Sequence, residues 1–158
     1  MLSRACQIGI RACLYLAIRS GATFVNTREI SDVLQESHHF VAKVLHQLAT
    51  GGLLRSYRGP NGGVGLAKSP EKIYLEDIIS IIDGKRSLDK CVLGRKDCSD
   101  ESPCPLHTEW SPIRKQILEL VHGSSLHDVA IRIQFDKKSD QTLKNVLSQY
   151  LRKETSNS

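Results

Sequence analysis

The sequence predicts a mainly α-helical protein with one small β-hairpin, arranged as a winged helix-turn-helix domain followed by a long dimerisation helix. Two short amphipathic segments separated by a tight turn indicate the helix-turn-helix, and a glycine-rich turn between two short apolar segments indicates the wing. A long apolar stripe after a cysteine-rich loop indicates the last helix. The 158 residues provide one compact core with an extension, and a second full core is not expected.

Helices of the first half are predicted where apolar residues recur every three or four positions between capping and stop residues. Asn26 and Glu29 have the spacing of a capping box, and Ser37 can cap the helix that follows the tight turn. The predicted helices span residues 2–20, 27–35, 37–51 and 74–82.

The hairpin is predicted from five consecutive turn-forming residues, Gly59 to Gly63, which separate two short segments with apolar and aromatic side chains. These segments, residues 53–58 and 64–68, are expected to pair as antiparallel strands with a basic tip. A glycine-rich turn can also cradle a phosphate, but the strand, lysine and helix of an ATPase phosphate loop do not surround this one, so a nucleotide site is not expected.

The sequence of the second half predicts a long helix from about Pro105 to His122. Pro112 can either kink this helix or mark its true start. Its apolar stripe is longer than a small domain needs for its own core, so we interpret the stripe as a dimerisation surface. A short helix at 125–133 and an amphipathic helix at 139–153 are expected before a polar, disordered tail. The dimerisation surface comprises Trp110, Ile113, Ile117 and Leu120.

Three cysteines and a histidine, Cys91, Cys98, Cys104 and His107, form a C-x6-C-x5-C-x2-H pattern in one polar segment. Thiolates and an imidazole together suit zinc, iron or an iron–sulfur cluster. The spacing is wider than the paired C-x2-C knuckles that wrap a single zinc ion, so it favours a bulkier cluster. A structural zinc site, a disulfide and incidental solvent-facing thiols are the alternatives.

The chain has a formal net charge of +5, and it contains no acidic residue between Glu36 and Glu71. The basic and histidine side chains of that segment would present a positive potential to a polyanion. Polar and charged residues interrupt residues 2–20, so neither a secretory signal nor a membrane span is predicted and the protein is expected to be cytoplasmic. In a reducing cytosol five cysteines fit ligands and buried thiols better than disulfides, and Cys6 and Cys13 are interpreted as buried thiols.

An enzyme, such as a thiol redox protein, is not expected. The chain has no C-x-x-C motif and no evident order of Ser, His and Asp that suggests a hydrolase. Cys104 is the only thiol with a candidate base close behind it.

These residues together resemble the Rrf-two family of bacterial winged-helix regulators, which includes IscR-like and NsrR-like members. The similarity spans about residues 1–133. It rests on the opening Leu2-Ser-Arg, on Ile30-Ser-Asp, on Arg58-Gly-Pro-Asn-Gly-Gly in the turn, and on Cys104-Pro-Leu-His with Trp110 behind it. The resemblance implies a homodimeric winged helix in which the long helix pairs the subunits and an iron–sulfur cluster controls binding to palindromic double-stranded DNA.

For the cluster, the resemblance implies that the three cysteines of the segment are ligands and that His107 is the fourth, as in IscR-like members with a [2Fe-2S] cluster. The first interval between cysteines is six residues here, where five is usual in the family. In nitric-oxide-sensing members a carboxylate near the start of the first helix, from the partner subunit, completes a [4Fe-4S] site. Gln7 stands at that position here, so [2Fe-2S] is favoured over [4Fe-4S], with Cys6 as a spare thiol beside it.

For DNA, the resemblance implies that the third helix enters the major groove and that the wing contacts the backbone or the minor groove. The family often carries a carboxylate where Ala42 stands, so a different base preference is expected. The expected contact residues are Ser37, His38, His39, Phe40, Lys43, Arg58 and Asn61. The expected organisation is a DNA-binding domain at 1–83, a cluster-binding loop at 84–104, the dimerisation helix and a short helix at 105–133, and a C-terminal extension at 134–158.

Overall fold

The computed structural model of the protein describes residues 2–19, 24–60, 62–85, 87–88, 90–95 and 99–135. The helix expected at 139–153 and the polar tail after it lie outside these ranges.

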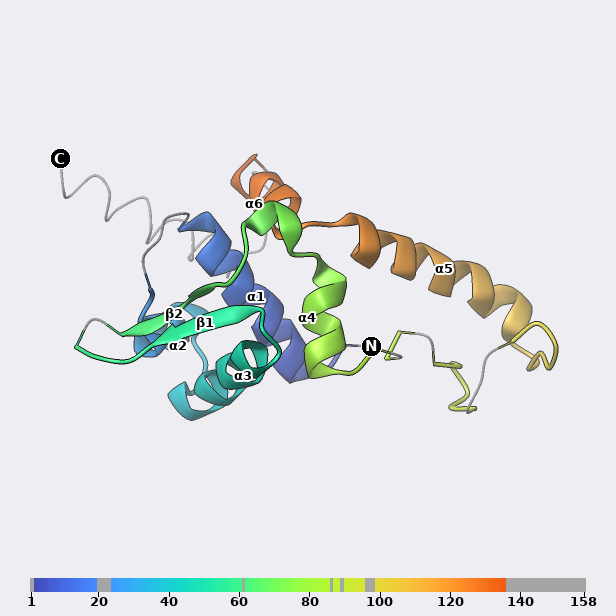
Figure 1. Cartoon of the computed structure of the whole chain (residues 1–158). Helices are drawn as coiled ribbons and strands as arrows, with labels where there is room; N and C mark the ends of the chain where they lie inside the picture. The colour runs from blue at the N-terminus through green and yellow to red at the C-terminus, as the bar shows by residue number, and fades with distance from the viewer. Residues whose placement is uncertain are drawn as a thin grey trace.

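Six α-helices, a 3-10 helix and a two-stranded antiparallel sheet make up the described part of the chain (Figure 1). This arrangement confirms the mainly α-helical fold with one hairpin that the sequence predicted. The elements are α1 (Arg4–Ile18), α2 (Thr27–Leu34), α3 (His38–Thr50), β1 (Leu54–Tyr57), β2 (Gly63–Leu66), η1 (Pro70–Lys72), α4 (Leu75–Ile82), α5 (His107–Gly123) and α6 (Leu126–Phe135).

Short polar side chains begin the first three helices. The side-chain oxygens of Ser3, Asn26 and Ser37 each accept a hydrogen bond from a backbone N–H two or three residues further on, at 3.1, 2.8 and 3.3 Å. Such caps satisfy N–H groups that have no partner within the helix. Glu29, expected to pair with Asn26 in a capping box, accepts a hydrogen bond of 2.7 Å from the Tyr15 hydroxyl on α1 and so joins α2 to α1.

The core is built around α1, which packs against α2, α3, α4 and α6. Gly9 allows α1 and α4 to approach closely, because a Cβ at this position would lie 2.4 Å from the Cδ1 of Ile82. Each fully buried aliphatic side chain contributes about 1.5–3 kcal/mol to folding by leaving water. The largest such side chains are Ile8, Ile30, Leu34, Leu45, Leu48, Ile73, Ile78 and Leu126.

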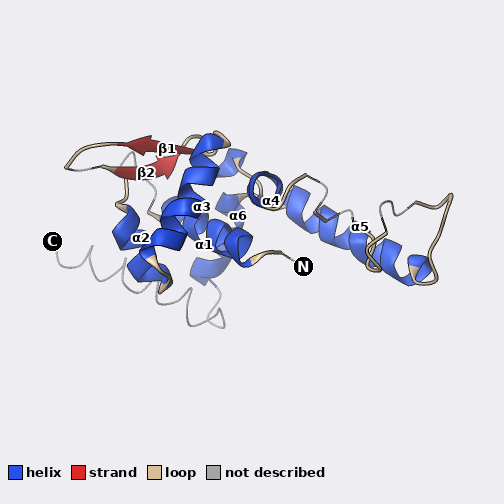
Figure 2. Ribbon diagram, turned by 90° about the horizontal axis from the view of Figure 1, so that it is seen from below, coloured by secondary structure: helices blue, strands red, loops and turns tan. Residues whose placement is uncertain are grey.

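The wing is fastened to the segment that leads into α2 (Figure 2). Val25 bridges Val64 of β2 through two backbone hydrogen bonds of 2.9 Å, so the hairpin gains a third, one-residue strand. A Cβ on Gly63 would lie 2.2 Å from the carbonyl oxygen of Val25, so a side chain at this position would force the two segments apart. The wing and the helix-turn-helix are therefore held in one unit.

Helix α5 extends away from the rest of the described chain, whereas its C-terminal end is tied to the body (Figures 1 and 2). Just beyond that end, Tyr74 and Ser125 form an antiparallel bridge. Val121 of α5 packs with Cys6 of α1 and Ile79 of α4 in a second apolar cluster. Helices α1 and α4 are thus the elements that pack against this end of α5.

The boundaries of α5 differ from those expected. The helix begins at His107 rather than at Pro105, because residues 104–107 form a turn in which the Cys104 carbonyl accepts a hydrogen bond of 2.9 Å from the His107 N–H. Pro112 lies inside the helix rather than at its start. The η1 turn and the two single-residue bridges were not predicted. Within the described ranges, every helix is too short or too polar to cross a membrane.

Candidate functional site

Two of the three predicted cluster cysteines meet in the structure. Cys91 and Cys104 are buried, and their Sγ atoms lie 3.8 Å apart. His107 is also buried, at the start of α5, and its Nε2 lies 2.7 Å from Oδ1 of Asp100. Cys98 lies outside the described residues. Among the residues that are described, no three His, Cys, Asp or Glu side chains are arranged to hold a metal ion.

The cysteine loop is held closed by contacts across it. The Arg95 guanidinium donates hydrogen bonds to the backbone oxygen and to Oγ of Ser102, at 3.1 and 3.0 Å. The Trp110 indole N–H donates to the backbone oxygen of Lys90 at 3.3 Å. A hydrogen bond from the Leu93 backbone, and further ones from the Arg95 backbone and the Cys104 side chain, lower the pKa of Cys91. A lowered pKa favours the thiolate, which is the form of cysteine that binds metals.

A groove of about 840 Å³ separates this loop from the body of the protein. It brings together the cysteine loop, the start of α1, the end of α4 and one face of α5. Cys91 therefore opens onto the same space as the first residues of α1. The groove is lined by Leu2, Ser3, Asp83, Ser87, Leu88, Lys90, Cys91, Val92, Trp110 and Ile117.

Asp83 ties the start of α1 to the end of α4 within this groove. Its carboxylate accepts a hydrogen bond of 2.9 Å from the Ser3 backbone N–H and a second one from the Ser3 hydroxyl. Cys6 lies beside it and is fully buried. Burial, together with the negative charge of Asp83 and a hydrogen bond to it, raises the pKa of Cys6 to about 12. Cys6 is therefore a neutral thiol at physiological pH.

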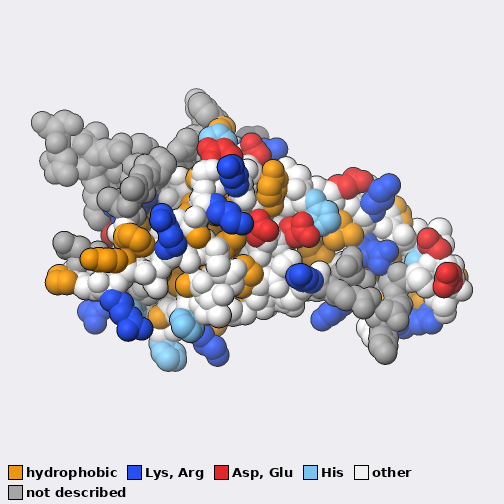
Figure 3. Space-filling model, in the orientation of Figure 1, with side chains coloured by type: hydrophobic (Ala, Val, Ile, Leu, Met, Phe, Trp, Pro, Cys, Tyr) orange, Lys and Arg blue, Asp and Glu red, His pale blue; other side chains and the backbone are white. Residues whose placement is uncertain are grey.

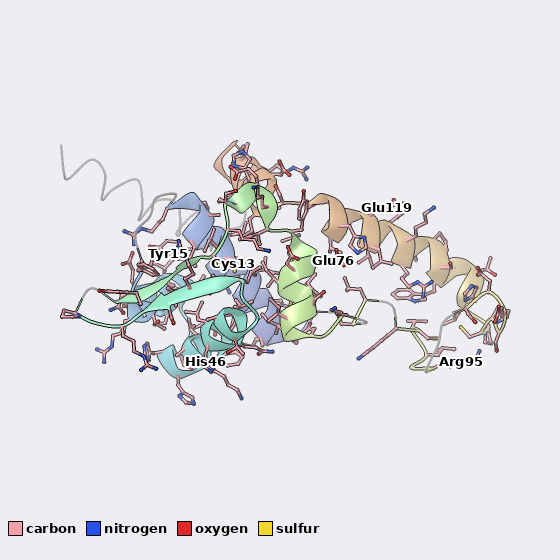
Figure 4. All side chains as sticks on the ribbon, in the orientation of Figure 1. Cys13, Tyr15, His46, Glu76, Arg95 and Glu119 are labelled. Carbon is pink, nitrogen blue, oxygen red and sulfur yellow. The ribbon has the colours of Figure 1, made fainter. Side chains whose placement is uncertain are left out.

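Polar contacts connect the other side of α1 to the helix-turn-helix. Besides the Tyr15 hydrogen bond to Glu29, Arg19 forms an ion pair with the same carboxylate. Arg11 donates to the carbonyl oxygen of Leu34 at 3.0 Å. Tyr15 and Cys13 of α1 are labelled in Figure 4. Helix α1 thus contacts the groove at its start and α2 along its length.

The residues predicted to contact DNA lie largely on one exposed surface. Ser37 caps α3, His38 and His39 lie in its first turn, Lys43 lies one turn further on, and Arg58 follows β1; all five are exposed. Figure 3 shows Lys, Arg and His side chains gathered over the part of the molecule where α3 and the hairpin lie. This surface is built from the segment without acidic residues.

Two predicted contact residues differ from this pattern. Phe40 is partly buried and packs against the core, so only part of its ring is accessible, and Asn61 lies outside the described residues. Three exposed residues of the same surface were not among the predicted contact residues, although His46 and Arg55 belong to the acid-free segment that was expected to attract a polyanion. His46 points outward from α3 (Figure 4), and Arg55 and Tyr57 are exposed on β1. The alternation of side chains along a strand, which places Tyr57 on the same face as Arg55, was the signal that could have identified Tyr57.

Comparison with known proteins places these features in context. The model of the Rrf2 (Rrf-two) family, described as iron-dependent transcriptional regulators, matches residues 2–132. The transcriptional regulator IscR of Aliivibrio salmonicida is 27% identical over 135 residues, which are 85% of this chain and 80% of the relative. The regulator NsrR of Bacillus licheniformis is 27% identical over 129 residues, 81% of this chain and 90% of the relative. The solved structure of CymR, the global cysteine regulator of B. subtilis, matches with a TM-score of 0.69 at 25% identity, over 83% of this chain and 96% of that one.

Proposed function

Because the chain belongs to the Rrf2 family of transcriptional regulators and is not an enzyme, we propose that it is a homodimer whose affinity for a DNA operator is controlled by an iron–sulfur cluster. The observation that carries the proposal is the buried pair of thiols, Cys91 and Cys104, 3.8 Å apart, with the buried His107 three residues after Cys104 in the sequence. Soft sulfur donors with an imidazole beside them suit iron and zinc better than hard cations. Cys98, between the two thiols in the sequence, is the proposed third cysteine ligand.

His107 is the proposed fourth ligand. Its hydrogen bond to Asp100 is the carboxylate–histidine pairing that orients ligating imidazoles in metal sites. The two alternatives from α1 are less suitable. Cys6 is buried and protonated beside Asp83, and the Gln7 side-chain amide donates to the backbone oxygen of Leu2 at 3.3 Å. The resemblance to IscR-like members, in which three cysteines and one histidine hold the cluster, favours a [2Fe-2S] cluster over the [4Fe-4S] cluster of a nitric-oxide or redox sensor.

The nature of the bound group can be tested by anaerobic purification, followed by a visible spectrum and assays of iron, sulfide and zinc. The proposal expects a coloured protein with iron and sulfide in equal amounts. A colourless protein with one tightly bound zinc per chain would support a regulator in which the loop is only structural. Titration of a DNA duplex with the holo and cluster-free forms then tests whether the cluster controls binding.

Helix α1 links the groove beside Cys91 to the helix-turn-helix. An iron–sulfur cluster supplies iron–thiolate bonds that oxidants and nitric oxide can break. Cys91 shares its groove with Ser3 at the start of α1 and with Asp83 at the end of α4, and α1 holds α2 through Glu29. A change in the loop is therefore expected to shift α1, and with it α3, relative to the dimer axis.

For DNA binding, we assign α3 to the major groove and Arg58 of the wing to the backbone or the minor groove. The first turn of α3 exposes His38 and His39, which we assign to base edges, and Lys43, exposed one turn further on, is assigned to a phosphate. Two such units in a dimer would read the half-sites of a palindrome.

Substitution of Arg58 and His39 separates backbone contacts from base contacts. Arg58→Ala is expected to weaken binding to every duplex and to lower the slope of log affinity against log salt by about 1. His39→Ala is expected to cost roughly 1–3 kcal/mol on the operator and little on random DNA, because a base contact carries the discrimination. Fluorescence anisotropy with an operator selected from genomic DNA and with a random duplex measures both effects. His122→Ala, on the exposed part of α5, serves as the control, and equal losses of His39→Ala on both duplexes would remove His39 as a base reader.

Substitution of His107 tests the fourth ligand. A neutral imidazole in place of a thiolate makes the site less negative, so His107→Cys is expected to retain a cluster with a lower reduction potential. His107→Ala is expected to shorten the lifetime of the cluster in air. Protein-film voltammetry and the decay of the visible absorption measure these changes. An unchanged spectrum, potential and lifetime in His107→Ala would assign the fourth position to another residue.

A further inference from the structure

One face of the wing carries an aromatic stack that the predicted DNA contacts do not include. The rings of Phe24 and Tyr57 have centroids 5.5 Å apart and are tilted by 30°. The Arg55 guanidinium lies over the Phe24 ring, 6.0 Å from its centroid. Arg55 and Tyr57 are two residues apart on β1 and therefore point to the same face of the hairpin.

The same face is left open by glycines. In the register of the hairpin, Gly65 lies opposite Arg55 and Gly63 lies opposite Tyr57, so β2 contributes no side chain there. Phe24 comes from the segment on the other edge of β2, next to Val25, and reaches Arg55 and Tyr57 across these glycines. Tyr57 nevertheless remains 59% exposed, more than any other large hydrophobic side chain in the described part of the chain.

We propose that this face is a further DNA contact, in which the Tyr57 ring packs on the sugar edge of the DNA backbone and Arg55 contacts the adjacent phosphate. The inference rests on the proposed DNA-binding function. The charge of the surroundings favours nucleic acid over a protein partner, because Arg58 follows Tyr57 directly and the chain contains no acidic residue from 37 to 70. A flat apolar ring beside cationic groups matches a backbone that alternates apolar sugars with anionic phosphates.

A purely structural role is the competing explanation. An aromatic ring placed across glycines shields the backbone of a sheet, and Phe24 already does this. If Tyr57 only completed that shield, its removal would lower the melting temperature of the protein and leave its affinity for DNA unchanged. The two roles therefore differ in what each predicts for DNA binding.

The test measures the affinity of the full-length protein for a random-sequence DNA duplex of about three helical turns, by anisotropy over a series of salt concentrations. Tyr57→Ala is expected to weaken binding about five- to tenfold with the salt slope unchanged, because an apolar contact releases no counterions. Arg55→Ala is expected to lower the slope by about 1, and Tyr57→Phe is expected to bind like the wild type. Tyr74→Ala serves as the control. Among the described tyrosines, Tyr74 is the other one with a large exposed fraction, and it lies away from the wing.

Hydroxyl-radical footprinting of the wild-type protein, read by mass spectrometry, provides a second measurement that does not depend on the stability of a variant. DNA is expected to protect Tyr57 from oxidation and to leave Tyr74 unprotected. Equal oxidation of Tyr57 with and without DNA, or equal affinity of Tyr57→Ala and the wild type, would overturn the inference. If the wild type bound no duplex even at low salt, the proposed DNA-binding function itself would fail.

Discussion

Protein carrying Cys104→Ala is expected to be purified without the visible absorption of an iron–sulfur cluster and without bound iron or sulfide. The substitution removes one of two buried thiols whose Sγ atoms lie 3.8 Å apart, and the iron of a cluster is held mainly by deprotonated cysteine ligands. Cys91→Ala and Cys98→Ala are expected to behave in the same way. The visible spectrum and chemical assays of iron and sulfide, both under anaerobic conditions, measure the loss.

Cys13→Ala is the matched control for this loss. Cys13 is fully buried in the core on α1, so its substitution is expected to cost about 1 kcal/mol of stability and to leave the cluster intact. Circular dichroism of all variants checks that the helices have formed. A folded Cys104→Ala protein with the colour and iron content of the wild type would exclude Cys104 from the ligand set.

Leu120→Glu is expected to convert the proposed dimer to a monomer. Leu120 is 58% exposed and Ile113 is 49% exposed on α5 of the single chain, yet both belong to the apolar stripe of that helix. A carboxylate buried without a partner costs about 3–5 kcal/mol, and the symmetry of a dimer introduces two of them. Sedimentation equilibrium is expected to show about twice the 17.6 kDa chain mass for the wild type and a single chain mass for the variant.

The exposure of Leu120 makes this experiment decisive. In a monomeric protein a glutamate at this position would be solvated, so the substitution would change neither mass nor stability. Lys115→Glu introduces the same carboxylate on the opposite side of α5 and is expected to leave the dimer intact. A wild type that sediments as a monomer at micromolar concentration would contradict the dimer.

The helices of the first half were predicted well from the sequence because each has apolar residues at helical spacing and a capping or stop residue at its end. Ser37 caps α3 as expected, and the glycine-rich turn lies where the hairpin reverses. The start of α5 was harder to predict. Leu106 has the spacing of the apolar stripe, but it lies at the N-cap position and is 44% exposed, so periodicity alone extended the helix too far. The bridge between Val25 and Val64 involves only one residue on each side, so it produces no repeated sequence pattern from which it could be predicted.

The candidate cluster ligands could be predicted because the spacing of thiols and imidazole is itself the signal. The contact between Ser3 and Asp83 could not, since it joins residues eighty positions apart whose types are common at helix ends. Cys6 was identified as a spare thiol, but its environment was not visible. Only the structure shows that it packs with Ile79 and Val121 and lies beside a carboxylate.

The close contact between Gly63 and the backbone of Val25 has a consequence for how such a regulator switches. Because the wing is bound to the segment that begins α2, the described parts of one subunit that would contact the two DNA grooves are expected to move together. In the proposed dimer, the proposed cluster would then act on the distance and angle between the two DNA-binding units. A switch of this kind changes which half-site spacings are tolerated along the double helix, while the bases preferred within each half-site stay the same.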